Sequence, residues 1–594
     1  GGPRIGVNPP GPQMIKKNVG YLGVKMTTNI SKEKRDILVN KIKEIKQFIA
    51  SSPQDENTAT LLSYIADIEK DIKGKKYGLV FEEHKEAIDE KLENYTPVLS
   101  EDKDLFINNG GQMNFLIEGD NLASLQLLEK THKGAIDFIY IDPPYNTGNK
   151  DFIYDDNIID TNDTYRHSKW VSFMQKRLEV ANKIISKNGL IFISINNIEL
   201  SSLKLLCDSI FGEKNFVTNL VWKCRSSLYY TEPLFSDITE SILVYAKDKS
   251  QFWLKSFDKD SIGDEKSLAG FYLNRVKKKY DGENYSNPDN DPNGPFITSG
   301  KVRNDGRPVY TVVSPTGVEH TEAWVYTPEV FKKLNEAGLI YWGVDGSAQP
   351  RKKSYLKDFI GNVSSNFLAD EFMRSVNSDG KIRKEKYFEV GTTESGTKEL
   401  NDILGKSLFD YPKPSSLIKY LLYLYPKKDF SVLDFFAGSG TTGHAVMKLN
   451  SEDGGNRKFI LCTNNENNIC RDVTYERIKR VIEKENHKAS LKYMKVDFVP
   501  ISDKLYYEYA DELLKHIKEL VELENGINFD GNKELAIILT EEDLDNFTNN
   551  ITDECKTIYL GHNVLPTEEQ EKLFKKHEIK INIIPDYYYR DLEG

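Results

Sequence analysis

A carboxylate, two prolines and an aromatic residue follow directly on an apolar run at Asp142, Pro143, Pro144 and Tyr145. Five of the six residues 136–141 are apolar and show no period, which is typical of a central parallel strand buried on both faces. The prolines cannot continue the strand, because each fixes its own φ and lacks a backbone N–H. We therefore expect Asp142 at the carboxyl edge of a sheet, where open α/β proteins bind ligands.

An exocyclic amino group has two hydrogens to donate, and this segment offers two acceptors. The Asp142 carboxylate can accept one hydrogen and the Pro143 carbonyl the other, while the Tyr145 ring can stack on a planar ligand. The segment thus predicts a site for a planar amine. The alternative is an ordinary strand end followed by a tight turn.

A second motif, SVLDFFAGSGTTG at residues 431–443, combines a short apolar strand, an acid and a glycine-rich turn. Its glycines follow the pattern G-x-G-x-x-G and open a helix predicted over 441–449, and they allow the backbone to approach a ligand closely. The same pattern also fits nicotinamide dinucleotide binding or a purely structural turn. The residues predicted to line the ligand are Asp434, Phe435, Phe436, Ala437, Gly438, Ser439 and Gly440.

Asp434 and the absence of a pyrophosphate-style continuation of the turn favour a nucleoside without phosphates, and S-adenosylmethionine is such a ligand. Glu466 follows a strand predicted over 459–463, where it is placed to accept both hydroxyls of a ribose. Lys413 and Ser415 precede a helix predicted over 418–425, with Ser415 as its N-cap. Lys413 and the free N–H groups of the helix are expected to hold the methionine carboxylate. Proline followed by serine is also an everyday helix start.

Composition and charge narrow the class of protein. The chain has 594 residues, enough for several domains, and a net charge of −11. From residue 501 onward 22 Asp and Glu oppose 10 Lys and Arg, so residues 1–500 are close to neutral and DNA contact must use local basic patches. Five scattered cysteines without a C-x-x-C pair predict a reducing compartment and no metal site. Without a long apolar run or an amino-terminal signal, we expect a cytoplasmic protein.

Changes in pattern along the chain predict its domains. Alternating strand and helix signals frame a stretch rich in turn residues, which reads as an insertion of short strands and loops. The predicted regions are a disordered or vector-derived start (1–30), a helical amino-terminal region (31–110), a catalytic half (111–250), an inserted recognition domain (251–400), a cofactor-binding half (401–497) and a small acidic α/β domain (498–594).

Together these residues resemble the amino-group DNA methyltransferases, whose D-P-P-Y motif holds the target base and whose F-x-G-x-G motif binds S-adenosylmethionine. The D-P-P-Y motif precedes Phe436-x-Gly438-x-Gly440 here, an order similar to the circularly permuted β class. The chain resembles the modification subunits of type III restriction systems still more closely. Segments that support this are residues 77–82, 116–121, 142–148, 167–170 and 464–467.

The resemblance implies a Rossmann-like α/β fold, a flipped adenine bound at Asp142, Pro143, Pro144 and Tyr145, and methyl transfer to its N6. It also implies that Glu466 binds the cofactor's ribose and that Asp120, with Asn121 beside it, lies near the cofactor's adenine. For Asp120 the alternative is ordinary N-capping of the helix that follows. Adenine is preferred to cytosine by family precedent only.

Basic clusters in the insertion are candidates for contact with DNA phosphates. The candidates are Lys277, Lys278, Arg303, Arg307, Arg351, Lys352 and Lys353. Solvated surface charge is the alternative for each cluster. We expect Trp324 and Trp342 to pack the small core of the insertion instead.

The expected partners are double-stranded DNA, a second copy of the chain in a homodimer, and a separate restriction subunit. A separate helicase-nuclease is expected because this chain contains no Walker A motif, G-x-x-x-x-G-K-[ST]. Three alternatives remain open: a stand-alone adenine or cytosine-N4 methyltransferase, a nicotinamide-dependent oxidoreductase, and a DNA-binding module with a degenerate site. The oxidoreductase leaves the D-P-P-Y segment unexplained.

Overall fold

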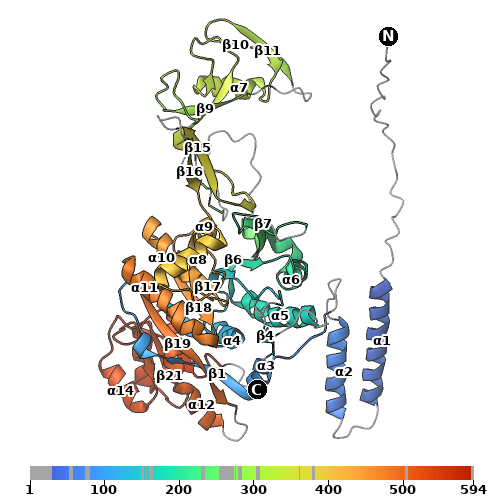
Figure 1. Cartoon of the computed structure of the whole chain (residues 1–594). Coiled ribbons are helices and arrows are strands. Elements are labelled where there is room, and N and C mark those ends of the chain that lie inside the picture. Colours follow the sequence, from blue (N-terminus) through green and yellow to red (C-terminus); the bar gives the residue numbers. More distant parts are fainter. Residues whose placement is uncertain are drawn as a thin grey trace. The chain divides into compact units, whose positions relative to one another are not determined.

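The structure is a computed structural model of the chain (Figure 1). Two compact units divide the chain, Gly1–Val80 and Phe81–Gly594. The residues that the structure describes are 30–51, 58–73, 81–148, 153–154, 157–158, 165–228, 234–252, 273–274, 276–278, 282, 284–300, 302, 308–359, 361–376, 382–501 and 506–589.

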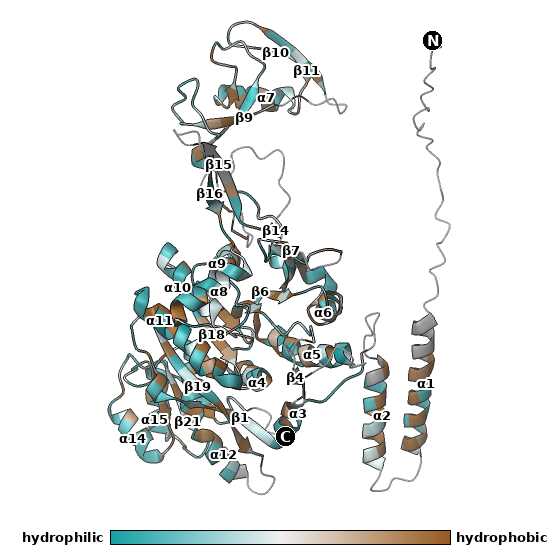
Figure 2. Ribbon diagram, viewed as in Figure 1, coloured by the Kyte–Doolittle hydropathy of each residue, from teal (hydrophilic) through white to brown (hydrophobic). Residues whose placement is uncertain are grey.

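The described part of the first unit consists of two helices, α1 (Ile30–Ser51) and α2 (Thr58–Lys73). Both carry hydrophobic and hydrophilic residues along their length (Figure 2). Lys46 Nζ lies 2.7 Å from a Glu69 carboxylate oxygen, which links one helix to the other. The predicted amino-terminal helices are therefore present.

The helical region predicted over 31–110 nevertheless ends too late. A third helix, α3 (Ala87–Asn94), leads directly into strand β1 (Tyr95–Glu101), which pairs with β19 (Ala489–Pro500). Because β1 finds its partner almost 400 residues away, no local pattern could reveal that it belongs to a sheet.

A ten-stranded mixed sheet is the framework of the second unit (Figure 1). The strands from β19 to β6 run parallel, whereas β8 is antiparallel to both of its neighbours. In spatial order the strands are β1, β19, β2 (Gln112–Glu118), β18 (Lys458–Thr463), β17 (Ser431–Asp434), β3 (Ile136–Ile141), β6 (Ile185–Ile195), β8 (Thr239–Ala246), β7 (Phe216–Lys223) and β14 (Phe367–Leu368).

Strands β3 and β17 lie side by side in the middle of this sheet, although about 290 residues separate them. Val432 is opposite Phe138 and Leu433 is opposite Ile139, in parallel register. The carboxyl ends of both strands therefore meet at one edge of the sheet. The order of the two motifs along the chain is thus compatible with one continuous site.

Helices cover both faces of the sheet and bury it in two cores. Ile139 and Ile141 of β3 belong to one core, and Phe138 and Tyr140 to the other, which explains the apolar run without a period. These helices are α4 (Asn121–Thr131), α5 (Arg166–Ile184), α6 (Leu200–Cys207), α8 (Thr393–Leu404), α9 (Ser415–Leu424), α10 (Thr441–Asp453) and α11 (Glu476–Lys484). None of the helices in the described ranges is long and apolar enough to cross a membrane.

The described part of the insertion forms small sheets, two of which share a core with helix α7 (Pro328–Glu336). Trp324 and Trp342 lie in its core, as predicted. Its strands are β9 (Phe296–Gly300), β10 (Val309–Val313), β11 (Glu319–Ala323), β12 (Ile340–Tyr341), β13 (Arg351–Tyr355), β15 (Glu371–Val376) and β16 (Ile382–Phe388). A two-stranded hairpin of the catalytic half, β4 (Ile153–Tyr154) with β5 (Asn157–Ile158), lies outside the insertion. The boundary predicted at residue 400 is wrong, because it cuts α8.

The boundary predicted at residue 498 is also wrong. It cuts β19, and helices α12 (Tyr506–Leu514) and α13 (Ile517–Asn525) place Leu513, Ile517 and Leu520 in the main core. Only the residues beyond α13 form a separate small core, around a parallel sheet of three strands. Its elements are β20 (Leu535–Ile538), α14 (Glu541–Asn549), β21 (Thr557–Gly561), α15 (Glu568–Lys576) and β22 (Lys580–Ile584).

Candidate active site

The two predicted motifs meet at the carboxyl edge of the central sheet. Asp142 follows the last residue of β3, and Asp434 is the last residue of the neighbouring β17. Asp434 is buried and accepts hydrogen bonds from the Thr442 hydroxyl at 2.5 Å and the Phe436 N–H at 3.0 Å. Burial raises the pKa of Asp434 to about 7, and the nearby Asp142 carboxylate adds to the increase. Two carboxylates in such proximity would be stabilised by a cationic ligand between them.

Asp142 already has a hydrogen-bond partner at each carboxylate oxygen. Tyr145 donates its hydroxyl to Oδ1 at 2.8 Å, and Lys413 donates its ammonium to Oδ2 at 2.8 Å. Burial, and then the charge of Asp142, raise the pKa of Tyr145 well above its usual value, so the phenol stays neutral. The Trp170 indole donates to the carbonyl of Pro144, not to that of Pro143. Residues 142–145 are thus fixed by hydrogen bonds from Tyr145, Lys413 and Trp170.

The residue after Tyr145 is fixed by a buried carboxylate that the sequence did not suggest. Asn146 has a φ of +56°, in the left-handed region that asparagine tolerates, and donates to Glu199 Oε1 at 2.6 Å. His167 Nδ1 contacts the same oxygen at 2.5 Å. Both Asn146 and Glu199 are fully buried. This contact sets the turn that carries Tyr145.

Lys413 is not where the sequence placed it. Its buried ammonium lies among Asp142, the Tyr145 hydroxyl at 2.9 Å and Glu240 at 3.3 Å, rather than at a free helix terminus. Burial acts to lower the pKa of Lys413, but Asp142 and Glu240 outweigh it and raise that pKa above its ordinary value. The residue therefore belongs to the predicted amine site, and Glu240 of β8 is a member of that site that the sequence missed.

Ser415 also differs from its prediction. The N-cap of α9 is Pro414, and Ser415 is the first residue of the helix. Its backbone N–H donates to Glu399 Oε2 at 3.0 Å, and its hydroxyl donates to the other oxygen of the same carboxylate. The α9 terminus thus holds a carboxylate, as expected there, but one supplied by α8 of this chain. The predicted N-cap role of Ser415 is therefore wrong, and its N–H, one of the free helix N–H groups expected to hold a ligand carboxylate, already donates to Glu399.

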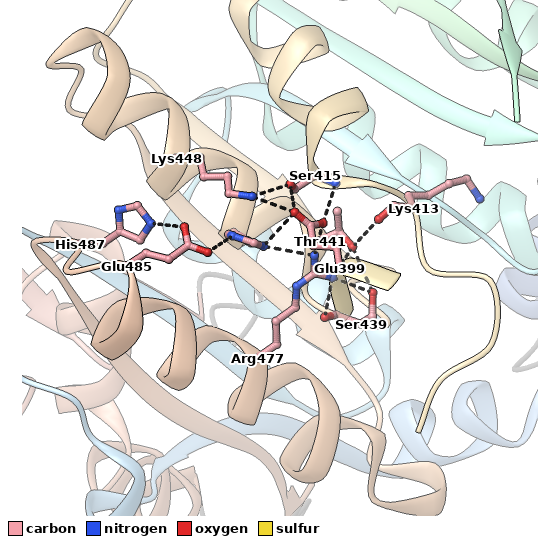
Figure 3. A network of polar contacts seen from close by, with 10 residues as sticks. Glu399, Lys413, Ser415, Ser439, Thr441, Lys448, Arg477, Glu485 and His487 are labelled. Carbon is pink, nitrogen blue, oxygen red and sulfur yellow. Dashed lines mark hydrogen bonds and ion pairs between the residues drawn. The ribbon is translucent and has the colours of Figure 1, made fainter. Parts of the chain in front are cut away.

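The buried Arg477 donates hydrogen bonds to the glycine-rich turn and to the start of α10 (Figure 3). Arg477 donates to the Ser439 carbonyl at 3.3 Å, the Thr441 hydroxyl at 2.7 Å and Glu399 at 3.0 Å. Burial acts to raise the pKa of Glu399, but Arg477, His444 and Lys448 overcome it and lower that pKa to about 2. The network joins α8, α10, α11 and the turn into one rigid support.

The glycines of the turn have a conformation that requires them. Gly438 and Gly440 have φ values of +48° and +74°. A Cβ at Gly440 would also lie 3.2 Å from the Thr474 side chain, and one at Gly443 only 2.7 Å from Ile478. The spacing of these glycines therefore serves close packing against Thr474 and α11 as well as approach to a ligand.

The remaining predicted cofactor residues divide into three groups. Phe435 and Ala437 place their side chains in the two cores, so only their backbone can face a ligand, while Phe436 is half-buried. Asp120 is the N-cap of α4, accepting from the N–H of Leu122 at 2.7 Å, which is the alternative that the sequence left open. Asn121 Oδ1 accepts from Arg177 at 2.5 Å. Glu466 is exposed just after β18, at the same edge.

The predicted DNA-contacting cations fall into unequal environments. Lys277 and Arg351 are exposed and Lys352 is half-buried, whereas Lys278 pairs with Glu371 at 2.6 Å. Arg303 and Arg307 lie outside the described residues. Lys353 is buried, 2.6 Å from Asp289 and 2.5 Å from Asp291. The prediction for Lys353 is therefore wrong, because its ammonium is already paired with two aspartates of the insertion.

Replacing Arg477 by methionine is expected to destabilise the protein by about 3–5 kcal/mol, since it leaves Glu399 without its main buried cation. Lys479→Met on the same helix is the control; it is partly exposed and should change stability by about 0.5 kcal/mol or less. Thermal unfolding without ligand measures both. Equal midpoints for the two variants would contradict the supporting role of Arg477.

The chain is similar to known DNA-modifying proteins over this site. Residues 136–477 match a family model described as DNA methylase. The Mod subunit of the type III restriction-modification enzyme StyLTI from Salmonella typhimurium is 34% identical over 403 residues, covering 63% of this chain and 56% of that protein. The EcoPI Mod subunit from Escherichia phage P1 is 32% identical, covering 60% and 58%. The type II methyltransferase M.KpnI from Klebsiella pneumoniae is 32% identical, covering 63% and 84%. The chain thus spans little more than half the length of the first two.

Proposed function

The chain belongs to the DNA methylase family, and from this premise we propose that it methylates the N6 amino group of adenine in DNA, using S-adenosyl-L-methionine. The observation that carries the proposal is the meeting of Asp142 and Asp434 on adjacent parallel strands. One carboxylate can serve the amine and the other the cofactor. In a nicotinamide-dependent oxidoreductase, Asp142 would have no role.

The residues at the sheet edge fit this cofactor. When bound, S-adenosyl-L-methionine supplies a methyl group made reactive by a positively charged sulfur. The raised pKa of Asp434 is a sign that this carboxylate is buried without sufficient compensation, which a cationic ligand would provide. Asp434, the backbone of the turn from Phe436 to Gly440, and Glu466 are the residues that we propose hold it. We also keep Asp120 and Asn121 as neighbours of its adenine, although both already bond within the protein.

We infer that Asp142 orients the target amine. An exocyclic nitrogen is a poor nucleophile, because its lone pair is delocalised into the ring. Accepting its hydrogens at Asp142 and the Pro143 carbonyl would favour a localised lone pair directed at the methyl group. Positive charge then develops on the nitrogen, so the Asp142 carboxylate matches the transition state better than the neutral base. The nitrogen finally gives its proton to Asp142.

The target base must leave the duplex to reach this edge. Tyr145 is the proposed stacking partner, and its ring is preorganised because its hydroxyl lies 2.8 Å from Asp142 and 2.9 Å from Glu240. No enzyme nucleophile is required. This agrees with Cys224, the cysteine near Glu240, since burial and that carboxylate raise its pKa to about 12 and keep the thiol protonated.

We further propose that the chain is the modification and specificity subunit of a type III system. The similarity to two Mod subunits supports this, together with a described insertion that has its own core. Double-stranded DNA, a second copy of the chain and a helicase-nuclease restriction subunit are the proposed partners, in the cytoplasm. A stand-alone methyltransferase is the second candidate, favoured by the coverage of M.KpnI. Co-purification with a helicase-nuclease chain distinguishes the two.

The charge reversal Arg351→Glu with Lys352→Glu is expected to weaken DNA binding and to reduce the slope of log K against log salt by about 1 to 2, since each lost phosphate contact removes about one unit. Lys353→Met is the matched comparison. Because Lys353 is buried and pairs with Asp289 and Asp291, its loss should lower thermal stability and leave the salt slope unchanged. An unchanged salt slope in the charge-reversal variant would show that Arg351 and Lys352 do not contact DNA and that another surface does.

Sequencing that detects modified bases tests the proposed function in cells. Genomic DNA from cells expressing the chain should carry N6-methyladenine at one short sequence, and DNA from cells expressing Asp142→Ala should not. N4-methylcytosine at a defined site would support the alternative base. Identical DNA from both strains would contradict methyl transfer.

A further inference from the structure

Lys413 is enclosed by three oxygen-bearing side chains from different parts of the sheet. Asp142 follows β3, Glu240 lies in the antiparallel β8, and Tyr145 lies between them in space. The ammonium is 2.8 Å, 3.3 Å and 2.9 Å from these three partners. An ammonium has three hydrogens to donate, so Lys413 is fully satisfied here.

The charges of this cluster do not cancel. It contains two carboxylates and one ammonium, and Tyr145 contributes no charge because burial raises its pKa well above the ordinary value. The sum is one negative charge. Without Glu240, Lys413 and Asp142 alone would sum to zero, and this cluster would lose its net attraction for the positive charge that develops on the amine.

Glu240 is also a second acceptor for both donors that now occupy Asp142. The Tyr145 hydroxyl lies 2.9 Å from Glu240 Oε2, almost the same distance as from Asp142 Oδ1. Lys413 reaches both carboxylates in the same way. An incoming amine can therefore take an oxygen of Asp142 while these donors turn toward Glu240, and no buried ammonium is left unpaired.

We propose that Glu240 is a positioning residue for methyl transfer, acting through Lys413 and Tyr145 to orient Asp142, to free its oxygens for the amine and to keep the site negative. The inference rests on the proposed function. The transfer itself forms the bond from nitrogen to the methyl carbon, breaks the bond from that carbon to sulfur, and delivers the amine proton to Asp142. Glu240 touches none of the reacting atoms.

Charge rescue tests the inference. Glu240→Gln keeps the shape of the side chain but brings the cluster to zero, and Lys413→Met combined with it restores one negative charge. At saturating DNA and cofactor, single-turnover transfer by Glu240→Gln should be on the order of 10- to 100-fold slower than wild type. The double variant should recover at least about tenfold of that loss. Cofactor and DNA Kd values should stay within about twofold in both.

An exposed carboxylate–ammonium pair provides the matched control. Glu452→Gln, alone and with Lys419→Met, alters a surface pair 2.6 Å apart on α10 and α9, and transfer should be unchanged in both variants. Circular dichroism and thermal unfolding verify that each variant folds. A merely structural Glu240 would make the double variant no faster than Glu240→Gln.

The outcomes separate the inference from the proposed function. If wild type transfers methyl groups and Glu240→Gln matches it, or the double variant shows no rescue, Glu240 has no positioning role. If Glu240→Gln instead weakens cofactor binding about tenfold or more, Glu240 belongs to the cofactor site and the inference is overturned. If wild type transfers no methyl group to any DNA, the proposed function fails and the inference falls with it.

Discussion

Asp142→Ala should abolish methyl transfer, with a loss of about a thousandfold or more, while the cofactor still binds. Asp142 accepts a hydrogen of the target amine and faces the charge that develops there, so its loss removes both orientation and stabilisation. Cofactor binding should change by no more than about threefold, because the glycine-rich turn follows β17 and is supported by Arg477. Single-turnover transfer and calorimetric titration of the cofactor measure the two effects.

Two further variants serve as comparisons in this experiment. Asp142→Asn keeps the side-chain volume but cannot carry the negative charge, and it should be nearly as inactive. Asp429→Ala removes an exposed aspartate at the opposite end of β17 and should be fully active. If Asp142→Ala lost transfer and cofactor binding together while circular dichroism stayed native, the division of labour between the two strands would be wrong.

Asp434 should make cofactor affinity depend on pH. Burial raises the pKa of Asp434 to about 7, so the carboxylate that would face a cationic ligand is largely protonated below that pH. Affinity should therefore be full at pH 8 and above and fall by up to about tenfold per pH unit below 7. Asp434→Asn should bind roughly 10- to 100-fold more weakly at pH 8 and lose this pH dependence. Titration calorimetry between pH 6 and 8.5 measures both; an affinity independent of pH in wild type would contradict the role of Asp434.

The raised pKa of Asp434 has the opposite consequence for the stability of the ligand-free protein, which should fall as pH rises. The folded pKa of Asp434 lies about three units above the ordinary value of 3.8, so the folded state holds an extra proton between about pH 4 and 7. The stability contributed by this group therefore falls as pH rises through that window, by up to about 4 kcal/mol. Asp434→Asn should raise the unfolding midpoint at pH 8 without ligand. A stable but weakly binding variant would identify Asp434 as a residue kept for its ligand.

The parts of the fold that the sequence predicted are those that depend on the residue pattern within a single segment. The β3 and β17 strands are short apolar runs, with an acid directly after β3 and at the end of β17, and their meeting follows from the common edge of parallel strands. The partners of β1 and β19 could not be found in this way. Their pairing joins segments about 400 residues apart, and two of the wrong predictions, the end of the helical region 31–110 and the boundary at residue 498, concern those strands.

The errors in the site have a similar cause. Lys413 precedes a helix, which suggests a carboxylate site, but its long side chain reaches Asp142, 271 residues away in the sequence. Glu240 has no motif around it and enters the site only because β8 runs antiparallel beside β6. Lys353 lies in a basic cluster, yet its two aspartate partners are more than 60 residues upstream. A charge pattern reports composition, whereas burial and pairing depend on distant chain segments.

Transfer of a labelled methyl group from S-adenosyl-L-methionine to DNA by the purified chain, followed by digestion and separation of the nucleosides, tests the central claim most directly. We predict that the label appears in N6-methyldeoxyadenosine with wild type and not with Asp142→Ala. DNA that remains unlabelled after incubation with folded, cofactor-binding wild type, over a mixture of all short sequences, would contradict it.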